Sequence, residues 1–158
     1  MKLVVMGVSG CGKSSVGEAL AKKLNANFID GDDLHPEANK LKMAAGIALS
    51  DEDRGPWLLE VGKALSSQPK LVVACSALKR SYRDKIRDAE PEARFIHLHG
   101  TKELLMQRVN SRENHFMPAS LLDSQLATLE KINSDENGKE FDTAKPVKQI
   151  VDEVIAWL

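Results

Sequence analysis

A glycine-rich stretch with a lysine and several serines follows directly after an apolar run near the start of the chain. The fixed positions of the pattern G-x-x-x-x-G-K-[ST] are occupied by Gly7, Gly12, Lys13 and Ser14. Glycines let the backbone curl until successive N–H groups point inward at an anion. In this pattern the lysine reaches the β- and γ-phosphates of a nucleotide, and the serine hydroxyl suits the Mg²⁺ that bridges them. The stretch therefore predicts a binding site for a nucleoside triphosphate.

The segments on both sides of the stretch are those that a phosphate-binding loop requires. The run Leu3–Val5 is apolar without alternation, which is typical of a strand buried on both faces of a parallel sheet. Residues 15–24 are predicted to form a helix whose positive dipole end faces the same phosphates. An ordinary turn between a strand and a helix is the alternative, and the context favours the loop. The nucleotide contacts are then expected from Gly7, Val8, Ser9, Gly10, Cys11, Gly12, Lys13, Ser14 and Ser15.

Three acids lie within four positions after the second predicted strand, namely Asp30, Asp32 and Asp33. A strand, a helix and a strand in succession predict a βαβ unit with parallel strands. Ligands of such sheets bind beyond the carboxyl ends of the strands, so these carboxylates are expected in the same crevice as the loop. Strand alternation places Asp30 and Asp32 on one side and Asp33 on the other. Asp32 or Asp33 could instead cap a helix starting at Leu34, and a cap does not exclude a catalytic role.

The third predicted strand, Leu71–Cys75, ends without an acid. In many P-loop enzymes an acid at this place helps to hold the metal ion. The carboxylate for Mg²⁺ must then come from elsewhere, and the pair Asp30 and Asp32 is the obvious candidate, acting together with the Ser14 hydroxyl.

Cationic side chains lie at three further places. Lys79 and Arg80 begin the helix after the third strand, where cations are slightly unfavourable, and this favours an anionic ligand over an exposed first turn. Arg54 lies among three acids, where neutralising a solvated charge run is the simpler interpretation. Arg108 and Arg112 lie four residues apart on one helix face.

The segment from Arg108 to Pro118 combines the end of a helix, two arginines and a loop. A closing lid beside a triphosphate site needs such a segment, because it supplies positive charge and excludes water. A surface helix with two arginines is the alternative. We place the candidate lid at about residues 108–118.

The remaining sequence predicts a fourth strand, Arg94–His99, an amphipathic helix at 120–132, an edge strand at 141–143 and a last helix opened by Pro146. His97 and His99 alternate with apolar residues, and this favours a solvated or locally bonded face over a metal site.

Composition sets further bounds. At 158 residues the chain is expected to form a single domain, residues 1–158, with a real core. A net charge of -1 gives no electrostatic footprint for nucleic acid or an anionic membrane. Without an apolar stretch of membrane-spanning length or a signal peptide, a cytoplasmic location is expected. The two cysteines, Cys11 and Cys75, do not suggest a disulfide framework.

Taken together, these motifs resemble those of the gluconate kinases (gluconokinases), a P-loop family of the shikimate-kinase-like type. The resemblance covers nearly the whole chain. It rests on Met6–Ser14, Asp30–Pro36, Asp51–Leu58, Cys75–Asp84, His115–Met117 and Leu121–Glu130. The first of these motifs is shared by thousands of nucleotide-binding proteins, whereas the others in this order are far more specific.

The resemblance implies an α/β P-loop NTPase fold, a five-stranded parallel sheet flanked by helices, with a mobile lid. It further implies transfer of the γ-phosphoryl group of ATP to O6 of D-gluconate with Mg²⁺, and commonly a homodimer. No nucleic acid or membrane partner is expected.

The resemblance also suggests roles for individual residues. Asp32 would hold the acceptor hydroxyl and act as general base, and Asp30 would lie near the Mg²⁺ shell with Ser14. Lys13 and Arg108 would contact the phosphates and the nucleotide. Arg54, Lys79 and Arg80 would be candidates for binding the carboxylate or hydroxyls of the sugar acid. Arg112 and His115 would belong to the lid, with Arg112 adding to charge stabilisation in catalysis and His115 to substrate binding.

Two other functions stay open at this point. A small-molecule kinase of the same fold could act on shikimate or a nucleoside monophosphate. A P-loop switch module would bind a nucleotide to signal, although the base-reading [NT]-K-x-D motif of GTPases is missing.

Overall fold

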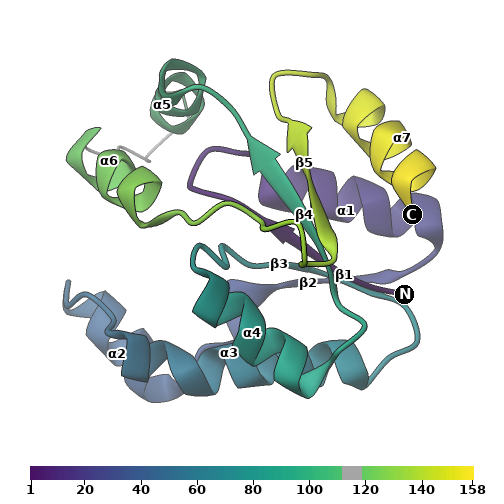
Figure 1. Cartoon of the computed structure of the whole chain (residues 1–158). Coiled ribbons are helices and arrows are strands. Elements are labelled where there is room, and N and C mark those ends of the chain that lie inside the picture. Colours follow the sequence, from purple (N-terminus) through teal and green to yellow (C-terminus); the bar gives the residue numbers. More distant parts are fainter. Residues whose placement is uncertain (112–118) are drawn as a thin grey trace.

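In the computed structural model, which describes residues 1–111 and 119–158, five strands form one parallel sheet. The strands are β1 (Lys2–Met6), β2 (Asn27–Asp30), β3 (Leu71–Ala74), β4 (Arg94–His99) and β5 (Gly138–Asp142). Their order across the sheet is β2-β3-β1-β4-β5, so that β1 lies at the centre. The predicted α/β fold with a five-stranded parallel sheet is confirmed (Figure 1).

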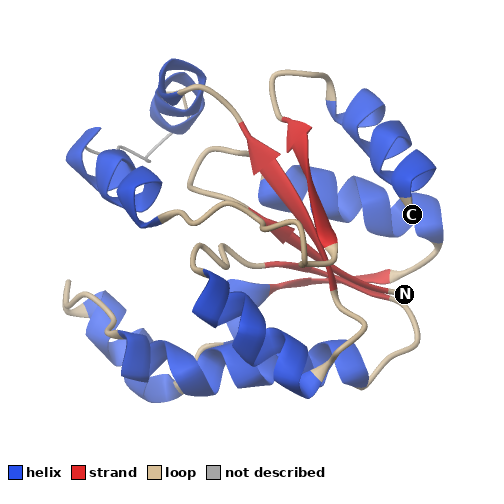
Figure 2. Cartoon of the chain, viewed as in Figure 1, coloured by secondary structure: helices blue, strands red, loops and turns tan. Residues whose placement is uncertain are grey.

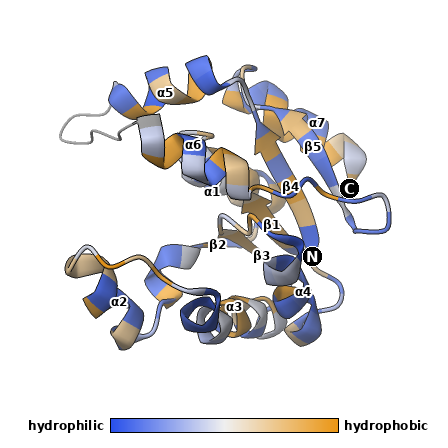
Figure 3. Ribbon diagram, turned by 60° about the vertical axis from the view of Figure 1, so that its left-hand side comes forward, coloured by the Kyte–Doolittle hydropathy of each residue, from blue (hydrophilic) through white to orange (hydrophobic). Residues whose placement is uncertain are grey.

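Helices cover both faces of this sheet (Figure 2). They are α1 (Lys13–Leu24), α2 (Glu37–Ala44), α3 (Asp51–Ser66), α4 (Arg80–Ala89), α5 (Lys102–Asn110), α6 (Ala119–Thr128) and α7 (Val147–Trp157). The helices α1 and α7 pack on one face, and α3 and α4 pack on the other. The hydropathy colouring shows the sheet as an apolar interior between helices that turn their polar sides outward (Figure 3).

The alternation of side chains along the central strand explains this arrangement. Leu3 and Val5 belong to the core cluster under α1 and α7, whereas Val4 and Met6 belong to the cluster under α3. All four side chains are fully buried. A strand with two buried faces has no polar alternation, as predicted for the run at the start of the chain.

Several element boundaries differ from those that the sequence suggests, and the reasons are local. The helix α1 begins at Lys13 instead of residue 15, because Gly12 adopts the left-handed conformation at the N-cap. The strand β5 covers Gly138–Asp142 instead of residues 141–143, because its pairing with β4 begins at Gly138. The helix α6 ends at Thr128, short of the expected residue 132.

Of the predicted solvated or locally bonded face at the two histidines of β4, the solvated alternative is wrong for His97, whose Nδ1 also has no hydrogen-bond partner among the described residues. His97 is buried, and its side chain lies on the same face as the polar network described below, whereas His99 is exposed. Within residues 1–111 and 119–158, no helix has the length and apolar character needed to cross a membrane. The candidate lid overlaps the described chain only at residues 108–111.

Candidate functional site

The phosphate-binding loop connects β1 to α1 through three glycines with positive φ. Gly7, Gly10 and Gly12 have φ values of 146°, 84° and 90°, a region that other residues rarely adopt. The Lys13 ammonium folds back across the loop, with Nζ 3.0 Å from the Gly7 carbonyl and 3.3 Å from the Val8 carbonyl. The loop is thus curled around its own lysine at the N-terminus of a helix, which is the arrangement of an anion-binding site.

The loop is also packed tightly against the helix α5. A Cβ atom at Gly10 would lie 2.7 Å from Val109 Cγ2 and 2.8 Å from the Leu105 carbonyl oxygen. A side chain at this position would therefore require α5 to move. Gly10 is therefore needed for close packing of the loop against α5, in addition to the curvature of the backbone.

One cavity of about 400 Å³ joins the loop to the carboxyl ends of β2 and β3. It is lined by Ser9, Gly10, Gly12, Lys13, Ser14, Asp30, Asp32, Ala74, Cys75, Ser76 and Gln125. The predicted loop residues and the two predicted aspartates therefore lie around the same space. This is the arrangement expected for ligands at the carboxyl edge of a parallel sheet.

A short 3-10 turn, Gly31–Leu34, presents the aspartates to this cavity. The Asp30 side chain caps the turn by accepting a hydrogen bond of 3.0 Å from the Asp32 N–H. The Trp57 indole donates a hydrogen bond of 2.8 Å to the Gly31 carbonyl and fixes the turn from α3. The alternative that Asp32 or Asp33 caps a helix is thus wrong, because the cap is Asp30 and α2 begins only at Glu37.

The electrostatic surroundings of Asp32 suit a proton acceptor. Partial desolvation by the surrounding protein raises the pKa of Asp32 above its usual range, and the negative charge of Asp30 raises it further. His35 and Lys13 act in the opposite direction. The carboxylate stays open to water through the cavity. A carboxylate with a raised pKa holds a proton more readily than an ordinary surface aspartate.

The residues of the cavity fit a Mg²⁺ ion that is shared with a nucleotide. The Ser14 hydroxyl and the Asp30 carboxylate would supply oxygen ligands, and the Asp32 carboxylate lines the same cavity. Groups of three or more His, Cys, Asp or Glu side chains that could hold a metal are absent from the described residues. Mg²⁺ does not need such a cage, because it keeps waters and takes one or two carboxylates together with phosphate oxygens.

A second hollow, of about 290 Å³, lies on the other side of the loop. It is lined by Gly10, Cys11, Gly12, Ser15, Val16, Arg108, Ser111, Thr143, Lys145, Val147 and Ile150. Arg108 donates to the Thr143 hydroxyl at 2.8 Å and to the Thr143 carbonyl at 2.6 Å, and the Thr143 hydroxyl donates to the Cys11 carbonyl at 2.5 Å. Arg108 is therefore fixed against the phosphate-binding loop.

The structure brings Arg54 and Lys79 together around Tyr82. The Arg54 guanidinium and the Lys79 ammonium lie 5.5 and 5.6 Å from the centre of the Tyr82 ring. Both also approach Asp51, at 3.7 and 3.4 Å, and the Tyr82 hydroxyl donates to Asp51 at 2.5 Å. This hydrogen bond, with the Lys79 charge, holds the pKa of Asp51 below its usual range. Neither cation is among the described residues that line the cavity beside the loop.

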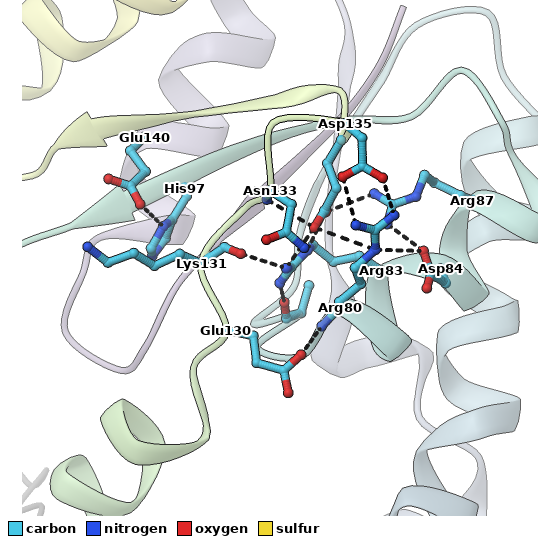
Figure 4. A network of polar contacts seen from close by, with 12 residues as sticks. Arg80, Arg83, Asp84, Arg87, His97, Glu130, Lys131, Asn133, Asp135 and Glu140 are labelled. Atoms are coloured by element: carbon cyan, nitrogen blue, oxygen red, sulfur yellow. Dashed lines mark hydrogen bonds and ion pairs between the residues drawn. The ribbon is translucent and has the colours of Figure 1, made fainter.

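Arg80 lies apart from these two cations, in a network that Figure 4 shows. Its guanidinium forms a bidentate pair with Asp135, with both N–O distances at 2.8 Å. The same network contains the buried Arg83, which is paired with Glu136 at 2.7 Å and donates to the Ala77 carbonyl at 2.9 Å. The structure does not bring Arg80 to the cavity residues, because its charge is satisfied elsewhere.

Two predicted site residues, Arg112 and His115, lie outside the described residues. Two residues that the sequence did not single out contact the site, namely Gln125 and Thr143. Both belong to segments far along the chain, with contacts to Ser9 and Cys11 across 116 and 132 positions. The run around Gln125 supports the family resemblance, but nothing in its spacing indicates contact with the loop.

The parallel sheet, the curled loop and the aspartates beside it define a P-loop kinase. The family model described as shikimate kinase matches residues 9–158. At the level of the fold, the chain superposes on shikimate kinase from Aquifex aeolicus with a TM-score of 0.67 at 18% identity, covering 99% of this chain and 95% of that one.

Much nearer relatives carry a more specific name. The chain is 50% identical to the gluconokinase of Gluconobacter oxydans (strain 621H), across 85% of this chain and 78% of the relative. It is 43% identical to a probable gluconokinase of Xenopus tropicalis, across 98% and 91%. A crystal structure of a gluconokinase from Sinorhizobium meliloti 1021 superposes with a TM-score of 0.89 at 51% identity, across 98% and 89%. The chain belongs to the gluconokinase family.

Proposed function

We propose that this chain transfers the γ-phosphoryl group of ATP to D-gluconate, yielding 6-phospho-D-gluconate and ADP. The observation that carries the proposal is the single cavity lined by Lys13, Ser14, Asp30 and Asp32. A triphosphate on the loop and an acceptor hydroxyl beside Asp32 would meet inside this space. The gluconokinases among the relatives support gluconate as the acceptor.

In the proposed reaction the O6 hydroxyl of gluconate gives its proton to Asp32. The oxygen then forms a bond to the γ-phosphorus while the bond from that phosphorus to the bridging oxygen of ADP breaks in line. Most of the catalysis comes from positioning and charge stabilisation, because the transition state is largely dissociative. Lys13 stabilises the phosphate charge from the loop, and Arg108 does so from the second hollow.

When bound, Mg²⁺ neutralises charge on the β- and γ-phosphates. We assign the Ser14 hydroxyl and the Asp30 carboxylate to its shell. Of the two carboxylate oxygens of Asp30, Oδ1 caps the 3-10 turn. The other oxygen is the one that we assign to the metal.

Gluconate is a small polyol with one carboxylate, so its site needs cations as well as hydroxyl acceptors. Arg54 and Lys79 converge on one aromatic ring, and we propose them for the carboxylate, with Arg54 suited to bidentate pairing. Arg80 is not part of this proposal, because Asp135 satisfies its guanidinium. Arg112 and His115 remain proposals as lid residues, based on the family resemblance.

The acceptor is tested by measuring ADP release with gluconate, shikimate, AMP and CMP in turn, each with ATP and Mg²⁺. We expect rapid release with gluconate alone. Turnover with shikimate or a nucleotide in place of gluconate would overturn the assignment of the acceptor. A switch module would instead hydrolyse ATP slowly and at the same rate with every acceptor.

We also propose a homodimer and a cytoplasmic location, both on the family resemblance. Light scattering coupled to size-exclusion chromatography measures the molar mass directly. A mass of about one chain, for a protein of 17.4 kDa, would contradict the dimer.

A further inference from the structure

The side chain of Gln125, on α6, makes two hydrogen bonds to one residue of the phosphate-binding loop. Gln125 Oε1 accepts from the Ser9 N–H at 2.8 Å, and Gln125 Nε2 donates to Ser9 Oγ at 3.1 Å. The orientation of this carboxamide is fixed by chemistry, since a backbone N–H can only donate and must face the amide oxygen. Gln125 therefore removes the Ser9 N–H from the set of loop amides that can bind an anion.

The same two bonds leave two neutral donors available. The amide nitrogen has a second N–H, for which no acceptor is found among residues 1–111 and 119–158. The Ser9 hydroxyl accepts from Gln125, so its own hydrogen is available to donate. Both side chains line the cavity that also contains Lys13 and Asp32. Neutral donors in a cavity that also holds a lysine and the proposed general base suit the oxygens of a γ-phosphoryl group.

The position of Gln125 also shows which phosphate it would affect. It lines the cavity shared with Asp30 and Asp32 and is absent from the described lining of the hollow that contains Arg108 and Thr143. Gln125 is thus on the acceptor side of the loop, where the γ-phosphate would lie, and away from the nucleoside side. Loss of its contacts should therefore change the binding of a triphosphate more than that of a diphosphate.

We propose that Gln125 binds the γ-phosphate of the donor and orients Ser9 toward it. This rests on the proposed function only in that the donor is a nucleoside triphosphate, and it does not depend on the acceptor. Loss of a hydrogen bond to a charged group should lower the affinity roughly 10- to 150-fold.

The test is calorimetric binding of ADP and of a non-hydrolysable ATP analogue, each with Mg²⁺, to the full chain. Gln125→Met removes both contacts to Ser9. We expect it to weaken the analogue by roughly 10-fold or more, with ADP affinity changed less than about 2-fold. Gln125→Glu can still accept from the N–H and the hydroxyl of Ser9, but it places a negative charge at the γ-phosphate. It should weaken the analogue further still, again with little effect on ADP.

The matched control is Gln107→Glu, the same chemical change at an exposed position of the neighbouring helix α5. This variant should bind both nucleotides as the wild type does. Ser9→Ala, which retains the backbone contact, serves as a second route if a Gln125 variant fails to fold, and it should weaken the analogue selectively. Equal losses for ADP and the analogue would mean that Gln125 only supports the loop, and unchanged affinities would mean that it contributes nothing; either result overturns the proposal.

The outcomes also separate this proposal from the function proposed above. Failure of gluconate to stimulate ADP release would overturn the acceptor and leave the nucleotide result standing. Failure of the wild type to bind the analogue at all would overturn both.

Discussion

Lys13 and Asp32 are the two residues of the site whose roles depend most directly on their own charge. The Lys13 ammonium lies within hydrogen-bond distance of the Gly7 carbonyl, at the centre of the curled loop. The Asp32 carboxylate faces it across one cavity. These two side chains can be predicted from short sequence motifs, because a motif of consecutive residues determines its own local geometry.

Lys13→Ala should lower kcat by orders of magnitude while the fold stays intact, because the phosphate charge in the transition state loses its cationic partner. Steady-state kinetics and the melting temperature measure the two effects separately. Lys23→Ala, on the exposed side of the same helix, is the control and should leave kcat unchanged. An unchanged kcat in Lys13→Ala would remove this lysine from the mechanism.

Asp32→Asn should lower turnover far more than ATP affinity, because an amide cannot take the proton of the acceptor hydroxyl. The wild-type kcat/KM should fall at low pH as Asp32 becomes protonated, and the raised pKa of this carboxyl places that fall above the usual range for aspartate. The variant should lose this acid limb. Asp33→Asn changes the neighbouring exposed carboxylate and should retain the limb; full turnover in Asp32→Asn would exclude Asp32 as the base.

At the scale of elements, the connections between helices and strands are what the sequence leaves open. The capping box at Ser50 sets the start of α3, and Trp57 of this helix contacts the 3-10 turn. Gln125 and Thr143 reach the loop only because α6 and β5 pack beside it, and no pattern of neighbouring residues encodes such distant contacts. The buried network around Arg83 was missed for the same reason.

The network around Arg83 joins the start of α4 to the segment that follows α6 (Figure 4). The side chains of Arg83 and Glu136 are completely buried and lie 2.7 Å apart. Burial acts to raise the pKa of Glu136, but the hydrogen bond from Arg83 and further partners outweigh it, and the pKa is lowered. Arg83 also supports the Ala77 carbonyl at a residue whose φ is 45°, an unusual value for alanine.

Arg83→Met should therefore lower the free energy of unfolding by about 3–5 kcal/mol, because it leaves the Glu136 carboxylate buried without its main partner. Urea denaturation at pH 7 measures the change. Arg87→Met is the matched control and should cost clearly less, since Arg87 is partly exposed and makes one contact to the same carboxylate. Equal losses in the two variants would show that burial of the pair does not determine the cost.

At the scale of the whole molecule, the strand order places the phosphate-binding loop at the centre of the sheet. The order β2-β3-β1-β4-β5 puts the acids after β2 and the loop after β1 at the same edge, with β3 between them. The apolar strands and the βαβ unit make this parallel arrangement predictable. The burial of His97 could not be predicted, since it depends on the segments that pack over β4 and β5.

Global stability should fall between pH 6.5 and about pH 4 because of His97. Its Nδ1 lacks a hydrogen-bond partner among the described residues. Burial lowers the pKa of the ring from 6.5 to about 4. The Glu140 charge acts to raise this pKa, whereas His99, Arg83 and Lys131 lower it further. The unfolded chain thus binds more protons in this interval, so stability is present above pH 6.5 and is lost as pH falls, by on the order of 3 kcal/mol.

The measurement is urea denaturation of His97→Leu, His99→Leu and the wild type at pH 7.5 and pH 5.0. The His97 variant should lose less stability between the two values than the wild type, whereas His99→Leu, which removes only a secondary contribution to the shift, should stay closer to the wild type. His35, whose pKa is also lowered by burial, contributes equally in all three proteins. Identical pH dependence in His97→Leu would refute the assignment.

One short stretch after the candidate lid contacts both the phosphate-binding loop and the backbone on either side of Lys79. Gln125 binds Ser9 of the loop, and five residues later the Glu130 N–H donates to the Leu78 carbonyl at 2.7 Å while its carboxylate accepts from the Arg80 N–H at 3.0 Å. One residue added between Gln125 and the end of α6 at Thr128 would turn the following part of the chain by about 100° about the helix axis and shift it by about 1.5 Å, so both contacts could not be made together. During evolution, this stretch should therefore keep its length constant, even where positions other than Gln125 and Glu130 change.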